Sequence, residues 1–321
     1  MPSVRPVALG SQPLAPRPPP AALDYVTRGG QRYLRMRPVD SLPPFFMNVV
    51  SDGDGWIFAA SHGALTAGRV DPDRALFPYQ TVDKILARAD SSGPLSVLLV
   101  RRRGRWRLWE PWQTSGRVYR IERALLKHVV GTEVIFEETN RDLGLRFSWT
   151  ICSCSEFGLV RRCRLEALGD EPVRVRYLDG WHQLIAPGIT VAHTSNLSFL
   201  ALAYLRHDRQ ARSQMGIFTL NAAISDRPEA AESLRAAAAW SIGHTRPTVL
   251  LSTAQIEAFR RGEPVRSEDE VRGEFGAYLV ADEARVSARH PREWITAADT
   301  WLDHAALVNL DARVRAPARL A

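Results

Sequence analysis

The sequence has 321 residues, of which 45% are apolar, so the chain is long enough to bury one large core or two ordinary ones. A membrane span is not expected because no apolar run reaches about 18 residues, and residues 1–22 lack the apolar segment of a secretory signal. The net charge of +7 is almost all arginine, since lysine occurs only at Lys84 and Lys127, and its scatter is typical of a GC-rich genome rather than of a nucleic-acid-binding surface.

Residues 1–23 are rich in Pro, Ala and Arg and predict a disordered leader. From residue 24 onward most of the chain predicts strands, because short β-branched or aromatic runs alternate with Gly, Pro or Asp turns. The predicted strand runs lie within residues 56–61, 95–103, 104–112, 117–123, 132–140, 144–154 and 159–180, the last divided by a turn at residues 169–172. No helix of about ten residues separates them, which favours an antiparallel sandwich over a parallel sheet.

The stretch SDGDGWIFAASHGALTAGRVDP, residues 51–72, is rich in glycine and acids. A calcium loop starting at Asp52 would place Trp56 at position five and Gly63 at position twelve, where oxygen ligands belong. No G-x-x-x-x-G-K-[ST] motif for phosphate is present. The Asp-Gly pairs instead predict the turn of a β-hairpin that enters the strand at Trp56, with a second turn at Gly63.

Two short helices are expected inside the strand-rich region. Apolar residues at helical spacing predict one over residues 81–90, capped by Thr81. A second is expected over residues 252–262, with Ser252 or Thr253 as its cap and Gly262 as its end.

The tail and one internal segment also carry apolar residues at helical intervals. Residues 291–314 predict a single amphipathic helix of about twenty residues. Residues 195–210 fit a buried strand and a helix equally well.

Catalytic and metal motifs are not found. Cys152, Cys154 and Cys163 have no nearby His at ligand spacing, so reduced thiols are expected rather than a zinc site. No G-x-S-x-G nucleophile motif occurs. Glu137 and Glu138 are adjacent and would point to opposite faces of a strand, unlike the facing carboxylates of a glycosidase. We therefore predict no catalytic residue, no metal and no cofactor.

Aromatic residues provide the clearer signal for function. Tryptophans cluster at residues 106–112, and Asp179, Trp181 and His182 surround Gly180. Aromatic faces beside polar side chains suit a sugar, although core packing is the more frequent role of such residues. The candidate substrate-binding residues are Trp56, Trp109, Trp112, Asp179, Trp181 and His182.

Three stretches carry a family resemblance: residues 51–85, with S-x-G-x-G-W, SHGALTAGRVDP and PYQTVDKI; residues 149–161, WTICSCSEFGLVR; and residues 175–188, VRYLDGWHQLIAPG. Together they resemble the N-terminal part of large bacterial proteins similar to cellobiose phosphorylases and cyclic β-glucan synthases, the group of glycoside hydrolase family 94. The resemblance covers most of residues 40–310 and rests on pattern and order.

The resemblance implies a mainly β, antiparallel two-sheet supersandwich of the galactose-mutarotase type with a C-terminal amphipathic linker helix. It implies three regions: a leader at 1–23, the sandwich at 24–285, and a helical linker at 286–321 toward an (α/α)6 catalytic domain. In this group the general acid and the phosphate-binding residues lie in the helical barrel, so no catalytic residue is carried over to this chain.

The leading hypothesis is a non-catalytic, cytoplasmic sandwich module that binds carbohydrate, braces a helical catalytic barrel and is inactive alone. Neither nucleic acid nor a membrane is an expected partner. An alternative is a mutarotase-like aldose epimerase, which would need His182, His193 and Glu156 to converge in one pocket. A third hypothesis is a sugar-binding or assembly module without chemistry. It is distinguished from the first by the last helix, whose apolar face would be exposed if a partner domain were missing.

Overall fold

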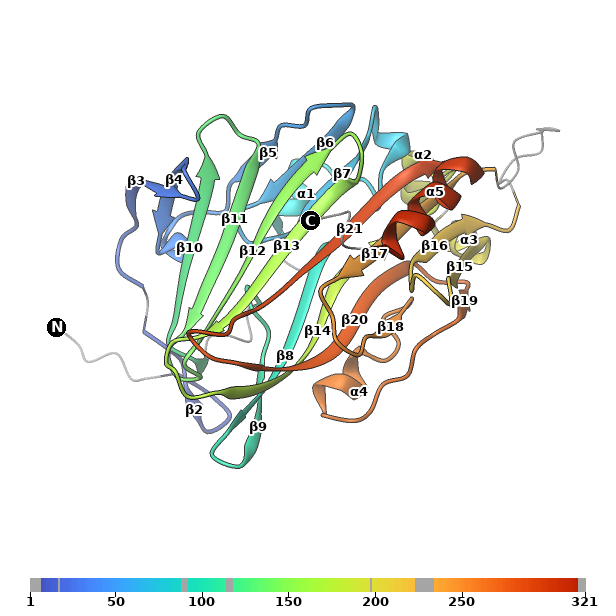
Figure 1. The fold of residues 1–321 in the computed structure, drawn as a ribbon. Helices are drawn as coiled ribbons and strands as arrows, with labels where there is room; N and C mark the ends of the chain where they lie inside the picture. The colour runs from blue at the N-terminus through green and yellow to red at the C-terminus, as the bar shows by residue number, and fades with distance from the viewer. Residues whose placement is uncertain are drawn as a thin grey trace.

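A computed structural model describes residues 7–16, 18–87, 92–113, 118–196, 198–222 and 234–316. Within these ranges the chain is mainly β, and the paired strands are antiparallel. The strands form two facing layers, which confirms the predicted antiparallel sandwich (Figure 1).

The first layer is one large sheet, which in the described part of the chain has eleven strands. In spatial order these are β19 (Glu270–Arg272), β15 (Leu205–Arg209), β16 (Gly216–Leu220), β17 (Ala236–Ile242), β21 (Arg292–Leu302), β13 (Gly158–Ala167), β12 (Leu145–Cys154), β11 (Glu133–Asn140), β10 (Ile121–His128), β4 (Gln31–Arg37) and β3 (Ala22–Arg28).

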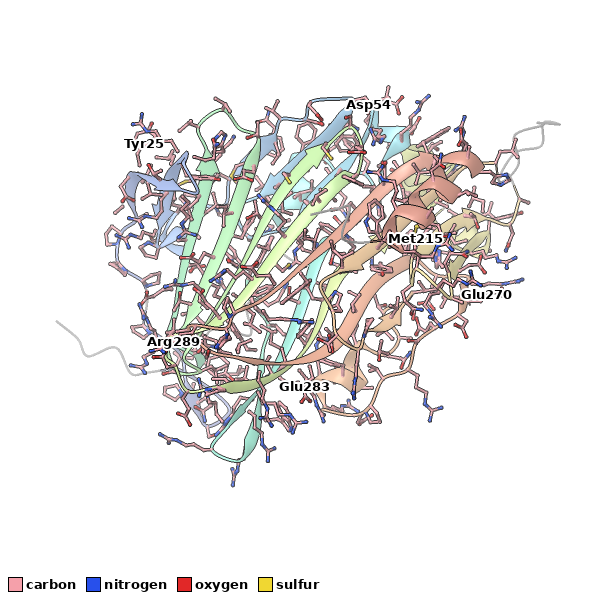
Figure 2. All side chains as sticks on the ribbon, viewed as in Figure 1. Tyr25, Asp54, Met215, Glu270, Glu283 and Arg289 are labelled. Carbon is pink, nitrogen blue, oxygen red and sulfur yellow. The ribbon has the colours of Figure 1, made fainter. Side chains whose placement is uncertain are left out.

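The second layer consists of two smaller sheets. One has the order β18 (Thr248–Leu250), β20 (Gly276–Val286), β14 (Val173–Leu184), β8 (Gly93–Arg102) and β9 (Arg105–Trp109), and the other has the order β5 (Phe46–Val49), β6 (Gly55–Ala60) and β7 (Leu65–Arg69). All three sheets contribute to one core, for example Phe147, Tyr177 and Ile57. In Figure 2 the loop with Asp54 lies at one end of the sandwich, and the turn with Arg289 lies at the other.

Strand β12 shows why this sequence forms a sheet with one face inside. Its apolar residues Leu145, Phe147, Trp149 and Ile151 occupy alternate positions and are 3% exposed or less. The residues between them, such as Arg146, are polar and point outward. Since successive strand residues face opposite sides, this period of two buries one row and leaves the other in solvent.

Five helices lie in the described ranges: α1 (Val82–Ala87), α2 (Val191–Asn196), α3 (Ser198–Ala203), α4 (Ile256–Arg260) and α5 (His304–Val314), with 3-10 turns η1 (Val39–Ser41) and η2 (Pro72–Arg74). The helices predicted over 81–90 and 252–262 are confirmed as the shorter α1 and α4. Ala89, expected on the first helix, lies outside the described residues. The predicted cap of the second helix was misplaced, because its N-cap is Gln255.

The prediction of one helix over 291–314 is wrong for its first half. Residues Arg292–Leu302 form strand β21, which pairs with β13 on one side and β17 on the other. Helix α5 begins only after Asp303, whose side chain accepts a hydrogen bond from the backbone N–H of Ala306 at 2.9 Å. Long-range pairing with two neighbouring strands outweighed the local helical pattern.

Helix α5 lies on the outer face of the large sheet (Figure 1). Leu310 and Val314 pack against Trp240 and Ala297 of the sheet and are buried. The buried face of α5 is thus covered by this chain, whereas Val308 on its other side is 66% exposed. An exposed apolar face on the last helix would have indicated a missing partner domain, and the apolar face of α5 is not exposed.

The predictions for residues 195–210 and for the N-terminal leader agree with the structure only in part. Residues 195–210, which fitted helix and strand equally, contain both: the end of α2, helix α3 and strand β15. The predicted disordered leader contains a short hairpin of β1 (Ala8–Leu9) and β2 (Gln12–Pro13). Residues 1–6 and 17 lie outside the described residues, and the division into 24–285 and 286–321 stays a prediction.

Candidate functional site

The glycine-rich stretch 51–72 forms the hairpin that the sequence predicts. The Asp-Gly loop joins β5 to β6, and Gly63 turns the chain from β6 into β7 with a φ of +100°, a conformation that favours glycine. Strands β6 and β7 pair from Gly55–Arg69 through Ala59–Leu65.

The two acids of the loop bind protein groups. Asp52 accepts a hydrogen bond from the backbone N–H of Ser155 at 2.8 Å, and Asp54 forms an ion pair with Arg69. Ser155 lies in the turn between β12 and β13 of the large sheet. Asp52 therefore fastens the hairpin loop to the opposite layer, while Asp54 holds Arg69 of β7 in the same small sheet.

The outward face of this small sheet carries the rings of Phe46, Phe58 and Trp56, and Tyr79 from the segment between η2 and α1 continues the row; we call these four rings the aromatic strip. Ring centroids lie 5.2 Å apart for Phe46 and Phe58, 5.7 Å for Phe58 and Trp56, and 6.0 Å for Trp56 and Tyr79. Phe46 is 37% exposed and the other three rings are half-buried. The strip therefore offers partly exposed ring surface.

Strand alternation and one glycine create the strip. Trp56 and Phe58 are two residues apart on β6, while Ile57 and Ala59 between and beside them point into the core. Trp56 pairs with Gly68 across the ladder, where an added Cβ would lie 2.8 Å from the indole ring and 2.5 Å from the carbonyl oxygen of Arg74. Glycine at position 68 lets the indole ring lie across β7.

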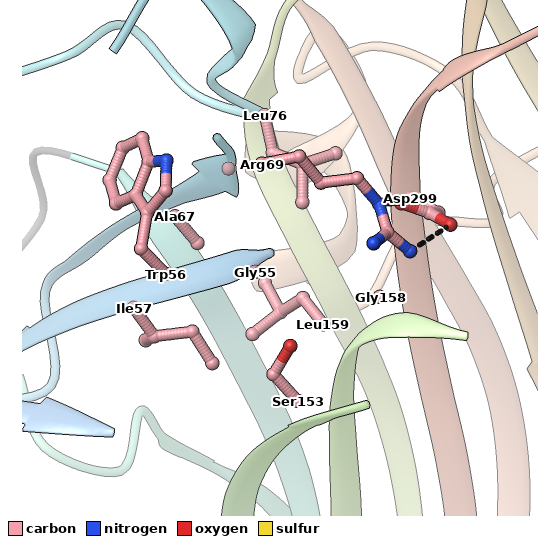
Figure 3. A pocket seen from close by; sticks show the side chains of 11 residues that line it. Gly55, Trp56, Ile57, Ala67, Arg69, Leu76, Ser153, Gly158, Leu159 and Asp299 are labelled. Atoms are coloured by element: carbon pink, nitrogen blue, oxygen red, sulfur yellow. Dashed lines mark hydrogen bonds and ion pairs between the residues drawn. The ribbon is translucent and has the colours of Figure 1, made fainter. Parts of the chain in front are cut away.

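An arginine and a carboxylate lie beside the strip (Figure 3). Arg69 donates from Nε to Asp299 Oδ1 at 2.7 Å and from Nη2 to Asp299 Oδ2 at 2.9 Å. The hydrogen bonds that Arg69 donates to Asp299, together with the neighbouring Asp54, raise the pKa of Arg69. The cavity here has a volume of about 10 Å³ and is lined by Trp56, Arg69, Asp299 and Ser153 among others. That volume matches one water molecule and excludes a sugar ring, so a sugar would have to bind on the strip itself.

Asp179, a candidate from the sequence, lies in the interior between the two layers. It is 1% exposed and accepts bonds from Arg161, Ser96 and Trp294 at 2.6–2.8 Å. Burial opposes the charge of Arg161, but the Asp179 carboxylate more than offsets this and raises the pKa of Arg161. Asp179 therefore joins strands of both layers and has no contact with solvent.

Trp109 and Trp112 are interior as well, at 1% and 4% exposure. Both bind the fully buried Glu138: Trp109 Nε1 donates to Oε1 and the Trp112 backbone N–H donates to Oε2, each at 2.6 Å. Arg123 supplies the compensating charge at 2.7 Å. Glu137 on the opposite face is half-exposed, as the sequence predicts for adjacent residues of a strand.

Trp181 is fully buried and packs near Phe77, and His182 is 7% exposed at the end of β14. Of the six candidates, Trp56 alone is half-buried rather than buried, and its ring packs in part against the cluster that includes Ala75 and Ile189. The structure does not bring it together with the other five. Sugar binding by the six stays a prediction. Phe46, Phe58 and Tyr79 were missed, although the two-residue spacing of Trp56 and Phe58 placed both on one strand face.

The residues nominated for an epimerase do not form a common site. Glu156 pairs with Arg313 at the surface, and His193 on α2 accepts a bond from the Thr190 backbone N–H at 3.2 Å. Neither the cavity beside Arg69 nor the cavity beside Arg161 is lined by Glu156, His182 or His193. The geometry therefore gives the epimerase alternative no support.

No family model and no curated protein matches the sequence. Among solved structures, the chain is similar to a bacterial glucoamylase complexed with acarbose (9% identity, TM-score 0.49, 94% of this chain and 37% of that one). It is also similar to a 4-alpha-glucanotransferase from Thermococcus litoralis (9%, 0.37, 88% and 40%) and to an aldose 1-epimerase from Klebsiella pneumoniae (9%, 0.30, 92% and 91%).

These neighbours are carbohydrate-active enzymes, and the chain spans less than half the length of the first two. A similarity at 9% identity does not identify the chemistry of this protein, which depends on its own residues. In the described part of the chain, no helix combines the length and apolarity that crossing a bilayer requires.

Proposed function

We propose that this chain is a non-catalytic sandwich module that binds carbohydrate on the aromatic strip. The observation that carries the proposal is the row of Phe46, Phe58, Trp56 and Tyr79 on an outer sheet face. The C–H faces of a sugar stack on such rings, and nearby polar groups accept or donate to its hydroxyls. Asn48, exposed and paired with Phe58 across the ladder, supplies such a group.

The shape of the strip bears on the kind of carbohydrate. Successive rings are tilted by 44° between Phe46 and Phe58, by 37° between Phe58 and Trp56 and by 76° between Trp56 and Tyr79. A flat crystalline polysaccharide would meet only one of these rings squarely. A single soluble oligosaccharide chain can follow these tilts, so soluble glucan fragments are the proposed ligands.

The finer form of the proposal rests on the sequence resemblance alone, since the apolar face of α5 is covered by this chain. As in glycoside hydrolase family 94-like proteins, the module would accompany and brace an (α/α)6 domain that performs phosphorolysis or transfer, and the chain alone would leave cellobiose unchanged in phosphate. The three unpaired cysteines suit the reducing cytoplasm, where we place the protein. Phosphate-dependent release of glucose 1-phosphate from cellobiose by the purified chain would contradict this form.

Calorimetric titration with cello- and malto-oligosaccharides tests the binding proposal. We expect Trp56→Ala to weaken binding about tenfold, corresponding to the loss of about 1.4 kcal/mol of stacking. Trp106→Ala is the matched control, since Trp106 is a half-buried tryptophan on β9 that stacks with Arg101 and Arg176. Undetectable binding by the unmodified chain, or equal losses in the two variants, would refute sugar binding at the strip.

A further inference from the structure

A second cavity lies between the turn at Gly63 and the buried Arg161, the ion-pair partner of Asp179. Its walls include His62, Ser96, Trp112, Trp149 and Arg161, and its volume is about 10 Å³. This is the room that one water-sized particle needs. A sugar or a phosphate group is too large for it.

Three residues that line this cavity each carry a buried N–H donor without a protein acceptor: Nε1 of Trp112, Nε1 of Trp149 and Nε of Arg161. The residues are close together, since the Trp112 and Trp149 ring centroids are 5.6 Å apart and the Arg161 guanidinium carbon lies 5.1 Å from the Trp149 ring. Buried N–H groups without a partner are costly, so three at one cavity call for a shared acceptor.

The backbone conformation at Trp112 is also consistent with a bound acceptor at this cavity. Trp112 has a φ of +65°, a left-handed conformation that is rare for a bulky residue. Its backbone N–H is held by Glu138 at 2.6 Å. Strained positions of this kind persist where the surroundings over-determine them, and they concentrate at ligand sites.

Three acceptors of the described residues that line the cavity are already engaged. Ser96 Oγ accepts from Arg161 Nη2 and donates to Asp179, while the Gln113 backbone carbonyl accepts from Arg123. His62 Nδ1 accepts from the Ala64 N–H, and burial lowers the pKa of His62, which keeps the ring neutral near pH 7.

Asp179 accepts no hydrogen bond from the Nε–H group of Arg161. Both carboxylate oxygens bind Nη1 at 2.8 Å. In the planar guanidinium, Nη1 lies on the side away from the Nε hydrogen. The Nε–H is therefore available to a second acceptor while the ion pair with Asp179 stays intact.

We propose that this cavity is a binding site for one small monovalent anion of the size of chloride, held by the N–H groups of Trp112, Trp149 and Arg161. A halide ion can accept hydrogen bonds from three donors at once. A water molecule can accept only two hydrogen bonds, so it would leave one of the three donors without a partner. The anion would join β12 and β13 of the large sheet to the loop after β9, and so brace the two layers.

Diffraction from crystals of the full chain grown with sodium bromide in place of chloride tests the site directly. We expect an anomalous bromide peak within hydrogen-bonding distance of all three nitrogen atoms. A peak found only elsewhere, or density at the site that scatters as water in saturating bromide, would overturn the proposal. This measurement needs no variant.

Thermal unfolding in sodium chloride and in sodium gluconate at equal ionic strength provides the second test. We expect saturating chloride to raise the Tm by about 2–4 °C relative to gluconate, whose anion is too large for the cavity. In Trp149→Phe, which removes one donor and keeps a ring, this increment falls by at least half. Trp240→Phe, a buried tryptophan under α5, keeps it. An increment absent from the unmodified chain, or equal in both variants, would count against the anion.

Discussion

The aromatic strip and the interior between the layers use the same residue types and differ in what covers them. Each has tryptophan beside an arginine–aspartate pair: Arg69 and Asp299 at the strip, with 17% and 6% of their side chains exposed, and Arg161 and Asp179 inside, with 0% and 1%. Inside, the opposite layer covers every ring, so these residues stabilise the fold. At the strip Phe46 is 37% exposed and the other rings are half-buried, with Trp56 packed against the cluster that includes Ala75 and Ile189. Part of the ring surface therefore stays accessible to a ligand.

The contrast between the two regions requires the buried ion pair of Arg161 and Asp179 to contribute strongly to stability. Asp179→Asn keeps the side chain's size but leaves the buried Arg161 charge uncompensated, and we expect a loss of about 3–5 kcal/mol in unfolding free energy by urea denaturation. Glu293→Gln is the control, since its ion pair with Arg164 is exposed and should contribute about 0–1 kcal/mol. Losses of similar size in the two variants would show that burial does not distinguish these pairs.

The strip can be altered through the glycine beneath it. Gly68→Ala introduces a methyl group against the Arg74 carbonyl and the Trp56 ring, and we expect a loss of about 2–3 kcal/mol in stability together with weaker sugar binding. Gly169→Ala should be nearly neutral, because nothing lies within 4 Å of its added Cβ. Full sugar affinity in Gly68→Ala would mean that the position of the Trp56 ring does not matter.

A smaller effect concerns pH. Burial of His244 against Tyr177 and Trp294 lowers its pKa to about 4, and the neighbouring Asp282 and Arg292 act in opposite directions. The unfolded chain binds this proton near pH 6.5, so stability is full above that pH and declines as pH falls toward 4. Between pH 7 and pH 5 the expected decline from this group is about 2 kcal/mol.

Urea denaturation at both pH values measures this dependence. His244→Asn should lose that share of the pH dependence, whereas His304→Asn, at the exposed start of α5, should retain it. If both variants decline as steeply as the unmodified chain between pH 7 and pH 5, His244 is not the group responsible.

Local sequence patterns placed strands β6, β8, β9 and β11 to β14, whereas the run predicted over residues 117–123 covers only the start of β10, and most strands after β14 were not predicted. The alternation of Phe147, Trp149 and Ile151 with polar residues gave β12, and the Asp-Gly pair gave the turn before β6. Such signals work because turn chemistry and a period of two act over a few residues, without reference to the rest of the fold.

The same patterns failed at β21. Its residues are buried on both faces, by the core at Trp294 and Ala298 and by α5 at Ala297, so no polar row marks a period of two. With alanines at helical spacing, residues 292–302 fitted a helix as well as a strand. The segment forms strand β21 because it pairs with β13 and β17.

The sequence by itself determined the fold class, the hairpin at 51–72 and which residues share a strand face. It did not determine which faces are covered, and that separates Trp56 from Trp109, Trp112 and Trp181. Alternation is a property of one strand, whereas burial depends on a second layer assembled from segments far away in the chain. The convergence of Trp112, Trp149 and Arg161 on one cavity has the same origin: three segments meet there only after both layers have packed.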